Sequence, residues 1–229
     1  MQGLFVSFEG PEGAGKTTQA RRLADHLQTE GYEVVLTREP GGTPLAEAIR
    51  ELVLSQSAAT EGSMSPATEA LLFTAARSDH VERLIRPALA EGQVVICDRF
   101  TGSTLAYQGG GRGLDAGALA AAQLLATDGL SPDLTLLLDL PVREGLARRF
   151  ADRDGDAPNR LDAESEAFHE RVRGMYLHLA DTNRPSWVIV RADQDPVAVA
   201  GVINDTVRSV LRERRTVSRR AQYDAVDAG

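Results

Sequence analysis

The chain alternates short apolar runs with longer amphipathic stretches. Five runs are almost continuously apolar: Leu4–Phe8, Glu33–Thr37, Val94–Cys97, Leu134–Asp139 and Trp187–Arg191. A short run without polar alternation is typical of a strand that is buried on both faces of a parallel sheet. The pattern therefore predicts five strands.

Between these runs, apolar residues recur at the spacing of a helix. The predicted apolar faces are Ala20, Leu23, Ala24 and Leu27; Leu45, Ile49, Leu52 and Val53, after a Thr43 cap and Pro44; and Phe168, Val172, Met175 and Leu179. Further helices are predicted over about 67–90, 115–127 and 197–214. The alternation of strand and helix predicts an α/β fold, a three-layer doubly wound five-stranded parallel sheet, with ligands beyond the carboxyl ends of the strands.

Two segments lack a clear pattern. Residues 152–158 are polar and rich in helix breakers, which predicts a loop. Residues 215–229 are polar and nearly patternless, and we expect a frayed tail there without regular structure. The predicted domain therefore comprises residues 1–214.

Composition narrows the classes of function. The formal net charge of −8 is unlike the overall basic field of a protein that binds nucleic-acid polymers. No apolar stretch reaches the length of about 18 residues that a membrane span requires. The one cysteine, Cys97, lies in an apolar run and is predicted to be a core thiol, which fits a reducing compartment. The four histidines show no metal-ligand spacing and are predicted to be surface or partly buried helix residues: His26, His80, His169 and His178.

A glycine-rich segment carries the strongest chemical signal. Residues 10–17, GPEGAGKT, match the pattern G-x-x-x-x-G-K-[ST] between a predicted strand and a predicted helix. Backbone N–H groups in such a loop turn inward around phosphate oxygens, and the helix N-terminus adds partial positive charge. The residues assigned to ATP binding are Gly10, Pro11, Glu12, Gly13, Ala14, Gly15, Lys16, Thr17 and Thr18. The loop predicts a fold like that of the P-loop NTP hydrolases.

Lys16 is the only lysine in a chain with 25 basic residues. Its ammonium is compact enough to bridge β- and γ-phosphate oxygens inside a ring of backbone amides, where a planar guanidinium fits less well. We therefore assign Lys16 to catalysis and expect Thr17 to offer its hydroxyl to Mg²⁺.

The phosphate loop alone does not specify a reaction. A GTPase needs the motif N-K-x-D to read guanine, and the single lysine lies elsewhere. Neither Asp98–Thr101 nor Asp139–Val142 gives the D-x-x-G motif. Two classes remain, a small kinase with a small-molecule acceptor and a nucleotide-sensing ATPase that uses the loop as a switch.

Longer segments resemble the bacterial thymidylate kinases, a family of P-loop nucleoside monophosphate kinases. They are TREPGGT at 37–43, FTAAR at 73–77, DRF at 98–100 and STLAYQGGGRG at 103–113. The resemblance runs from about residue 4 to about residue 211 and implies the reaction ATP + dTMP → ADP + dTDP, for dTTP synthesis. It also implies Mg²⁺ and a cytoplasmic homodimer, for which the alanine-rich helix near residues 116–126 is a candidate contact. The alternative is another nucleoside monophosphate kinase or a deoxynucleoside kinase, because these share the loop and a D-R or E-R pair.

The resemblance assigns residues to the acceptor. It implies that Phe73 lies against the thymine ring and that Arg77 donates to its O4 atom. From spacing alone, the same pair also fits one core aromatic and one surface arginine. The other implied roles are Arg99 and Arg38 at the acceptor phosphate, Glu12 at the 3′-hydroxyl, Tyr107 at the deoxyribose, Ser103, Thr104 and Gln108 near the base or sugar, and Asp98 near Mg²⁺.

Relatives without an arginine in the phosphate loop bring one from a mobile lid, which corresponds here to residues 148–162. Arg149 and Arg153 are the candidates for contact with the transferring phosphoryl group, and the sequence does not rank them. The alternative is a solvated lid surface. We also expect Gly109–Gly111 to form a flexible loop.

Overall fold

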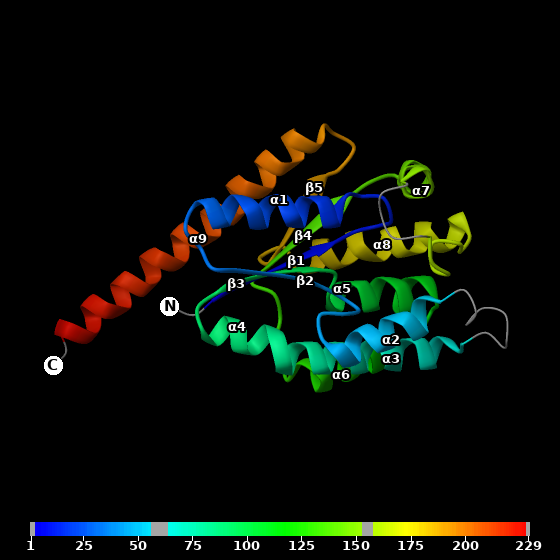
Figure 1. Ribbon diagram of the computed structural model, residues 1–229, viewed down its shortest axis with the longest axis horizontal. Coiled ribbons are helices and arrows are strands. Elements are labelled where there is room, and N and C mark those ends of the chain that lie inside the picture. The colour runs from blue at the N-terminus through cyan, green and yellow to red at the C-terminus, as the bar shows by residue number, and fades with distance from the viewer. Residues whose placement is uncertain (1–2, 56–63, 153–157, 228–229) are drawn as a thin grey trace.

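Five parallel strands form the centre of the computed structural model, which describes residues 3–55, 64–152 and 158–227. They are β1 (Leu4–Glu9), β2 (Val34–Arg38), β3 (Val94–Asp98), β4 (Leu134–Asp139) and β5 (Trp187–Arg191). Their order across the sheet is β2-β3-β1-β4-β5 (Figure 1). All five predicted strands are thus confirmed, and β1 lies where the strand order reverses.

Helices cover both faces of the sheet. The helical segments are α1 (Lys16–Thr29), α2 (Pro44–Leu54), α3 (Pro66–His80), α4 (Arg86–Ala90), α5 (Thr101–Thr104), α6 (Ala116–Thr127), α7 (Val142–Ala151), α8 (Glu166–Thr182) and α9 (Pro196–Asp227), with the π-helical segments η2 (Val81–Ile85) and η3 (Leu105–Gly111). Figure 1 shows α1 and α9 on one face and the group α2 to α6 on the other. The three-layer fold is therefore confirmed.

The core divides between these two faces because side chains alternate along each strand. Val6 and Phe8 of β1 pack with Leu23 of α1 and Ile203 of α9. Phe5, which points to the opposite face, packs with residues of η2 and α4. A third cluster joins Leu137 of β4 to η3 and α8. These clusters fix the helix ends that surround the carboxyl edge of the sheet.

Most predicted helices are confirmed, but α2 is rotated from the predicted orientation. The side chain of Thr43 caps α2 by accepting a hydrogen bond from the Ala46 N–H group, as expected. The buried residues of α2 are Ala46 and Val53, whereas Leu45 and Leu52 are each 54% exposed. The small Ala46 faces inward because α2 packs closely against α3.

The C-terminal helix is longer than predicted. The predicted helix ends at residue 214, whereas α9 continues to Asp227 and projects from the body of the molecule (Figure 1). No proline or glycine lies between Gly201 and Ala228, and arginine and alanine are good helix formers, so nothing in the sequence ends the helix earlier. The expected frayed tail is wrong over this range.

Candidate active site

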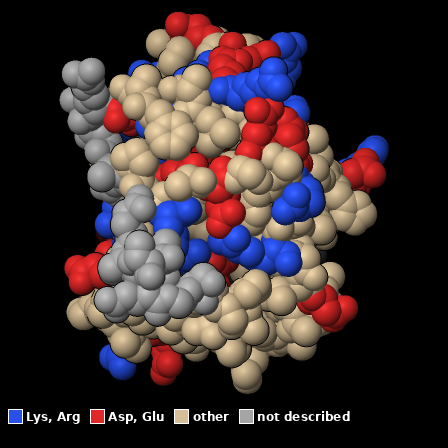
Figure 2. All heavy atoms as spheres, turned by 90° about the vertical axis from the view of Figure 1, so that its right-hand side faces the viewer, with Lys and Arg blue, Asp and Glu red and all other residues tan. Residues whose placement is uncertain are grey.

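A cleft of about 620 Å³ opens beyond the carboxyl ends of β1 and β3. Figure 2 shows this end of the molecule, with charged side chains gathered around the recess in its middle. Among the described residues, eight basic ones line the cleft: Lys16, Arg21, Arg38, Arg50, Arg77, Arg99, Arg148 and Arg149. Four acidic residues of the described ranges line it as well: Glu12, Glu39, Asp98 and Asp152. An acidic protein therefore concentrates positive charge here, which suits small anionic ligands.

The phosphate loop forms one wall of the cleft. Gly13 and Gly15 have φ values of 68° and 82°, in the left-handed region that favours glycine. A Cβ atom at Gly13 would lie 2.0 Å from the carbonyl oxygen of Gly145, so the loop also packs tightly on α7. Gly10, Pro11 and Ala14 are buried and do not line the cleft. Such loops bind phosphate with backbone N–H groups, so these three positions support the loop without side-chain contacts.

Lys16 lies at the base of this loop. Its side chain is buried, and its Nζ donates a 2.8 Å hydrogen bond to the carbonyl oxygen of Pro11. Burial, together with the charge of Arg99, lowers the pKa of Lys16 to about 8. A bound anion would raise the pKa of Lys16 again and hold the ammonium in its charged form.

Thr17 and Asp98 meet across the cleft floor. The Thr17 hydroxyl donates a 2.5 Å hydrogen bond to Oδ2 of Asp98. The other carboxylate oxygen, Oδ1, is buried and has no hydrogen-bond partner among the residues that the structure describes. A hydroxyl and an incompletely satisfied carboxylate beside a phosphate loop are the donor set that Mg²⁺ prefers, so these residues fit the expected ion.

Arg99 lies at the centre of the polar contacts. It has a φ of 73°, which is uncommon for a residue with a side chain. Its guanidinium donates to the carbonyl oxygen of Gly10 at 3.2 Å and to Glu12 at 2.9 Å. It also donates to Ser103, Tyr107 and Tyr176. These contacts aim a guanidinium into the cleft from a strained turn.

Glu9, the last residue of β1, holds that turn. It is fully buried and accepts hydrogen bonds from the N–H groups of Phe100 and Ser103 at 2.9 and 3.1 Å. The hydroxyls of Ser103 and Tyr176 also donate to it, at 2.7 and 3.0 Å. Burial raises the pKa of Glu9, although the Ser103 hydrogen bond and the charge of Arg99 oppose the shift.

Glu12 and Tyr107 form a pair beside Arg99. The Tyr107 hydroxyl donates a 2.5 Å hydrogen bond to Glu12, and the Arg99 guanidinium lies 5.1 Å from the Tyr107 ring centroid. Burial alone would raise the pKa of Glu12, but the charges of Arg99 and Lys16 lower it to about 2. Glu12 is therefore a carboxylate that accepts hydrogen bonds from neighbours or ligands.

The candidate base pocket lies on the other side of Arg99. Phe73, Arg77, Thr104 and Gln108 all line the cleft there. Arg77 is only 2% exposed, so it is not the surface arginine that spacing alone allowed. Its guanidinium contacts Thr104, the Phe100 carbonyl and Gln123, among others.

Residues from the lid side of the chain also line the cleft. Arg149 lines the cleft and contacts the buried Asp162 at 3.0 Å. Arg153 lies outside the described residues, so Arg149 and Arg153 stay unranked as candidates for contact with the transferring phosphoryl group. Arg38 also lines the cleft and is 3.5 Å from Glu47.

Two local expectations were wrong. Gly109–Gly111 do not form a flexible loop but end the helical segment η3, because α8 packs directly on them. A Cβ atom at Gly111 would lie 2.5 Å from the Phe168 ring. Among the histidines, His80 and His169 are buried, at 0% and 2% exposure, because each lies on the inward face of its helix.

Several residues of the site were missed in the sequence. Glu9 had a local signal, since it is an acid that ends a buried strand just before the phosphate loop. Tyr176 also had one, because α8 buries Phe168, Val172, Tyr176 and Ala180 in place of the Met175 and Leu179 positions of the predicted face. The other described residues that line the cleft without a recognisable motif, and that were missed, are Arg21, Arg50, Leu54, Arg148, Asp152, Asn159 and Leu161.

Comparison with known proteins identifies the family. The sequence matches the thymidylate kinase family over residues 8–202. The chain belongs to the thymidylate kinase family. It is 52% identical over 211 residues to the thymidylate kinase of Thermomicrobium roseum, which covers 92% of this chain and 97% of the relative. It is also 52% identical over 206 residues to the enzyme of Caulobacter vibrioides, which covers 90% of this chain and 96% of that one.

A solved structure agrees with this membership. The crystal structure of thymidylate kinase from Ehrlichia chaffeensis is similar to this chain, with a TM-score of 0.72 and 32% identity. The match covers 91% of this chain and 99% of the other. The resemblance stated from the motifs is therefore confirmed, and so is the fold that it implied.

Proposed function

We propose that this protein transfers the γ-phosphoryl group of ATP to dTMP, giving dTDP and ADP for dTTP synthesis. Membership of the thymidylate kinase family supports this reaction. One structural observation carries it: a phosphate loop and a second anion site built around Arg99 line the same cleft. A switch ATPase needs only the first of these sites, so the second favours a kinase with an anionic acceptor.

On the donor side, the phosphate loop binds the ATP phosphates with backbone N–H groups. Lys16 bridges the β- and γ-phosphate oxygens and offsets the charge that develops during transfer. Arg149 approaches the γ-phosphoryl group from the lid side of the cleft. Arg153, outside the described residues, remains a second candidate for this role.

On the acceptor side, Arg99 binds the 5′-phosphate through paired N–H donors, and Arg38 adds a second positive charge. Phe73 stacks on the thymine ring, and Arg77 and Thr104 supply polar groups at its edge. Tyr107 packs against the deoxyribose. The other proposed contacts are Glu12 to the 3′-hydroxyl, and Ser103 and Gln108 near the sugar or base.

The reaction needs no general base, because the attacking oxygen belongs to a phosphate that is already ionised. Positioning and charge neutralisation therefore carry catalysis. Thr17 and Asp98 would hold Mg²⁺, which supplies additional charge neutralisation at the β- and γ-phosphates when bound. The chain's own contribution is to hold the two phosphates in line and to keep water from the cleft.

Two further proposals concern the whole protein. We propose a homodimer, because Leu71 of α3 and Leu124 and Leu125 of α6 are exposed by 64%, 64% and 85% on neighbouring helices. We also propose a cytoplasmic location, which suits nucleotide synthesis and the free, buried thiol of Cys97. Within the part of the chain that the structure describes, no helix has the length and apolar character needed to cross a membrane.

A coupled ADP-release assay tests the function. The acceptors are dTMP, dUMP, dCMP, AMP and thymidine, and dTMP should give the highest kcat/KM. Lys16→Ala should lower kcat at least about a hundredfold, because the charge on the transferring group loses its main partner. A preference for thymidine would favour a deoxynucleoside kinase, and a preference for AMP or dCMP would favour a different monophosphate kinase.

A further inference from the structure

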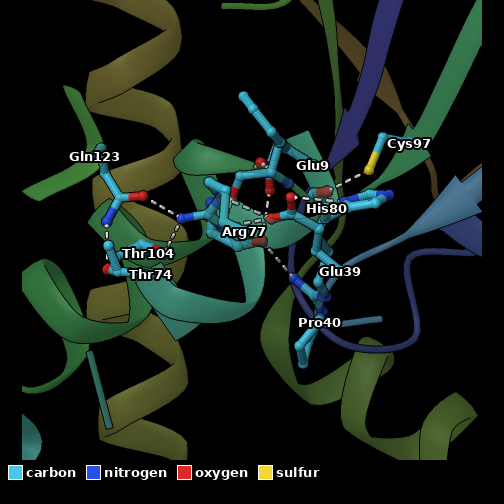
Figure 3. Close-up of polar contacts among 12 residues, drawn as sticks. Glu9, Glu39, Pro40, Thr74, Arg77, His80, Cys97, Thr104 and Gln123 are labelled. Atoms are coloured by element: carbon cyan, nitrogen blue, oxygen red, sulfur yellow. Dashed lines mark hydrogen bonds and ion pairs between the residues drawn. The ribbon is translucent and has the colours of Figure 1, made fainter. Parts of the chain in front are cut away.

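Within the described part of the chain, Arg77 donates four hydrogen bonds to protein atoms, and its guanidinium has five N–H groups. Nη1 donates to Thr104 at 2.8 Å and to Gln123, and Nη2 donates to the carbonyl oxygen of Phe100 at 2.9 Å. Nε and Nη2 both contact Oε2 of Glu39 at 2.7 Å. Figure 3 shows Arg77 between Gln123 on one side and Glu39 on the other. A buried cation held this firmly has its orientation set by its partners.

Glu39 is the only carboxylate among these partners. It is 6% exposed, and its backbone N–H group donates to the carbonyl oxygen of Asp98 at 3.0 Å, which ties it to the end of β3. A buried carboxylate is costly unless both oxygens are satisfied. Arg77 satisfies Oε2, so the orientation of Glu39 depends on what holds Oε1.

His80 holds that second oxygen. It is fully buried, and its Nδ1 lies 3.0 Å from Oε1 of Glu39. An ionised carboxylate only accepts hydrogen bonds, so Nδ1 carries the proton and donates. Nε2 lies 2.8 Å from the Thr37 hydroxyl at the end of β2. His80 therefore links Thr37 to Glu39, and Glu39 in turn links His80 to Arg77.

The loop after Glu39 encloses this link. A Cβ atom at Gly42 would lie 2.6 Å from Nε2 of His80 and 2.6 Å from the Thr37 hydroxyl. Gly42 has a φ of 86°, so its conformation and its lack of a side chain both suit this position. Gly42 of the TREPGGT segment thus leaves room for His80.

A metal ion is the competing explanation for this cluster. Ligand atoms of Glu39, His80 and Cys97 lie within 4.8 Å of one another. However, each is already engaged, because His80 bonds with Glu39 and Thr37, and the Cys97 thiol donates to the carbonyl oxygen of Arg99 at 3.0 Å. Burial also raises the pKa of the Cys97 thiol well above its usual value, which disfavours the thiolate that a metal requires.

We propose that His80 is a positioning residue for the acceptor base, acting through Glu39 on Arg77. This inference rests on the proposed function, since it assumes that Arg77 lies at the base of dTMP. His80 does not reach the cleft itself, whereas Glu39 and Arg77 line it. The loss of His80 should therefore weaken the acceptor site and leave the ATP site intact.

The experiment compares His80→Phe with His80→Asn and uses His178→Phe, at an exposed position of α8, as a matched control. His80→Phe keeps an aromatic ring but leaves Oε1 of Glu39 without its donor, and we expect KM for dTMP to rise at least about tenfold. KM for ATP should stay within about twofold. His80→Asn places an amide donor near the former Nδ1 position and should restore KM for dTMP to within about threefold of the wild type. The control should match the wild type.

A second variant keeps the test decisive if His80→Phe does not fold. Thr37→Val removes only the hydroxyl that holds Nε2, and KM for dTMP should rise about threefold to tenfold. The inference is overturned if KM for dTMP is unchanged in Thr37→Val, if both substrates are affected equally, or if His80→Asn is no better than His80→Phe. If the wild type itself does not phosphorylate dTMP, the proposed function fails before this comparison applies.

Discussion

Lys16 carries a positive charge in a place that disfavours it. Burial of its side chain and the charge of the neighbouring Arg99 lower the pKa of Lys16 to about 8. Bound phosphates would reverse both effects, because they bring negative charge to the ammonium. The free enzyme should therefore be more sensitive to alkaline pH than the ATP complex.

This difference gives a pH prediction. As pH rises through about 8, Lys16 loses its proton in the free enzyme, so kcat/KM for ATP should fall. The kcat profile should fall at a higher pH, because kcat reports the complex in which phosphates hold the proton. Steady-state kinetics from pH 6.5 to 9.5 measure the kcat and kcat/KM profiles. A flat kcat/KM profile for ATP across that range would contradict the assignment of Lys16 to the ATP phosphates.

Tyr107 has two proposed roles, one for its ring and one for its hydroxyl, and two variants can distinguish them. Its ring lies beside the proposed deoxyribose site, and its hydroxyl donates to Glu12 at 2.5 Å. Tyr107→Ala should reduce the preference for dTMP over the ribose acceptor UMP, because the ring no longer obstructs a 2′-hydroxyl. Tyr107→Phe should keep that preference and lower kcat/KM for dTMP, because Glu12 loses a hydrogen bond. If both variants had the same preference for dTMP over UMP, the Tyr107 ring would not contact the sugar.

At the scale of elements, η3 carries acceptor-side residues and depends on close packing against α8. A Cβ atom at Gly110 would lie 2.7 Å from Cβ of Met175 and 3.0 Å from the carbonyl oxygen of Arg171. At Gly109 the nearest atom would be Cδ1 of Leu119, at 3.4 Å. The two adjacent glycines therefore differ in how much space a methyl group has.

This contrast predicts that the same change to alanine has different effects at the two positions. Gly110→Ala should lower the free energy of unfolding by about 1–3 kcal/mol and raise KM for dTMP, because the methyl group pushes η3 away from α8. Gly109→Ala should change it by less than about 0.5 kcal/mol, since alanine favours the helix and its methyl group has room. Chemical denaturation of both variants checks this, and equal losses would argue against packing as the cause.

At the scale of the molecule, α9 joins the core along its first part. Among the side chains of α9 that the structure describes, Leu211 is the last one in the core, at 9% exposure, and Arg214 donates to the carbonyl oxygen of Gly3 at 2.7 Å and pairs with Asp133. The helix then continues away from the body of the molecule (Figure 1). Stability should therefore depend on residues up to 214 more than on those beyond.

Two truncations test this division. A chain ending at Arg214 should unfold within about 2 °C of the full chain and keep its activity. A chain ending at Val210 loses the burial of Leu211 and the contacts of Arg214, and its free energy of unfolding should fall by at least about 2 kcal/mol. Thermal and denaturant unfolding compare them. If the chain ending at Arg214 were much less stable than the full chain, residues 215–229 would have a structural role.

The sequence by itself determined the strands, the phosphate loop and the family. Each of these depends on contiguous residues, because a buried strand is a short apolar run and the phosphate loop is one continuous segment, residues 10–18. The resemblance also named most residues that line the cleft. Only the tertiary structure brought together Glu39 of the loop after β2, Arg77 and His80 of α3, and Gln123 of α6.

The physical reason is that a buried polar group must find its partners wherever the fold supplies them. The partners of Arg77 come from three separate segments, so no local pattern marks them. The same holds for Glu9, whose partners lie about ninety residues or more away along the chain. Periodicity also predicted the wrong rotation of α2, because the rotation depends on which neighbour each face of the helix meets.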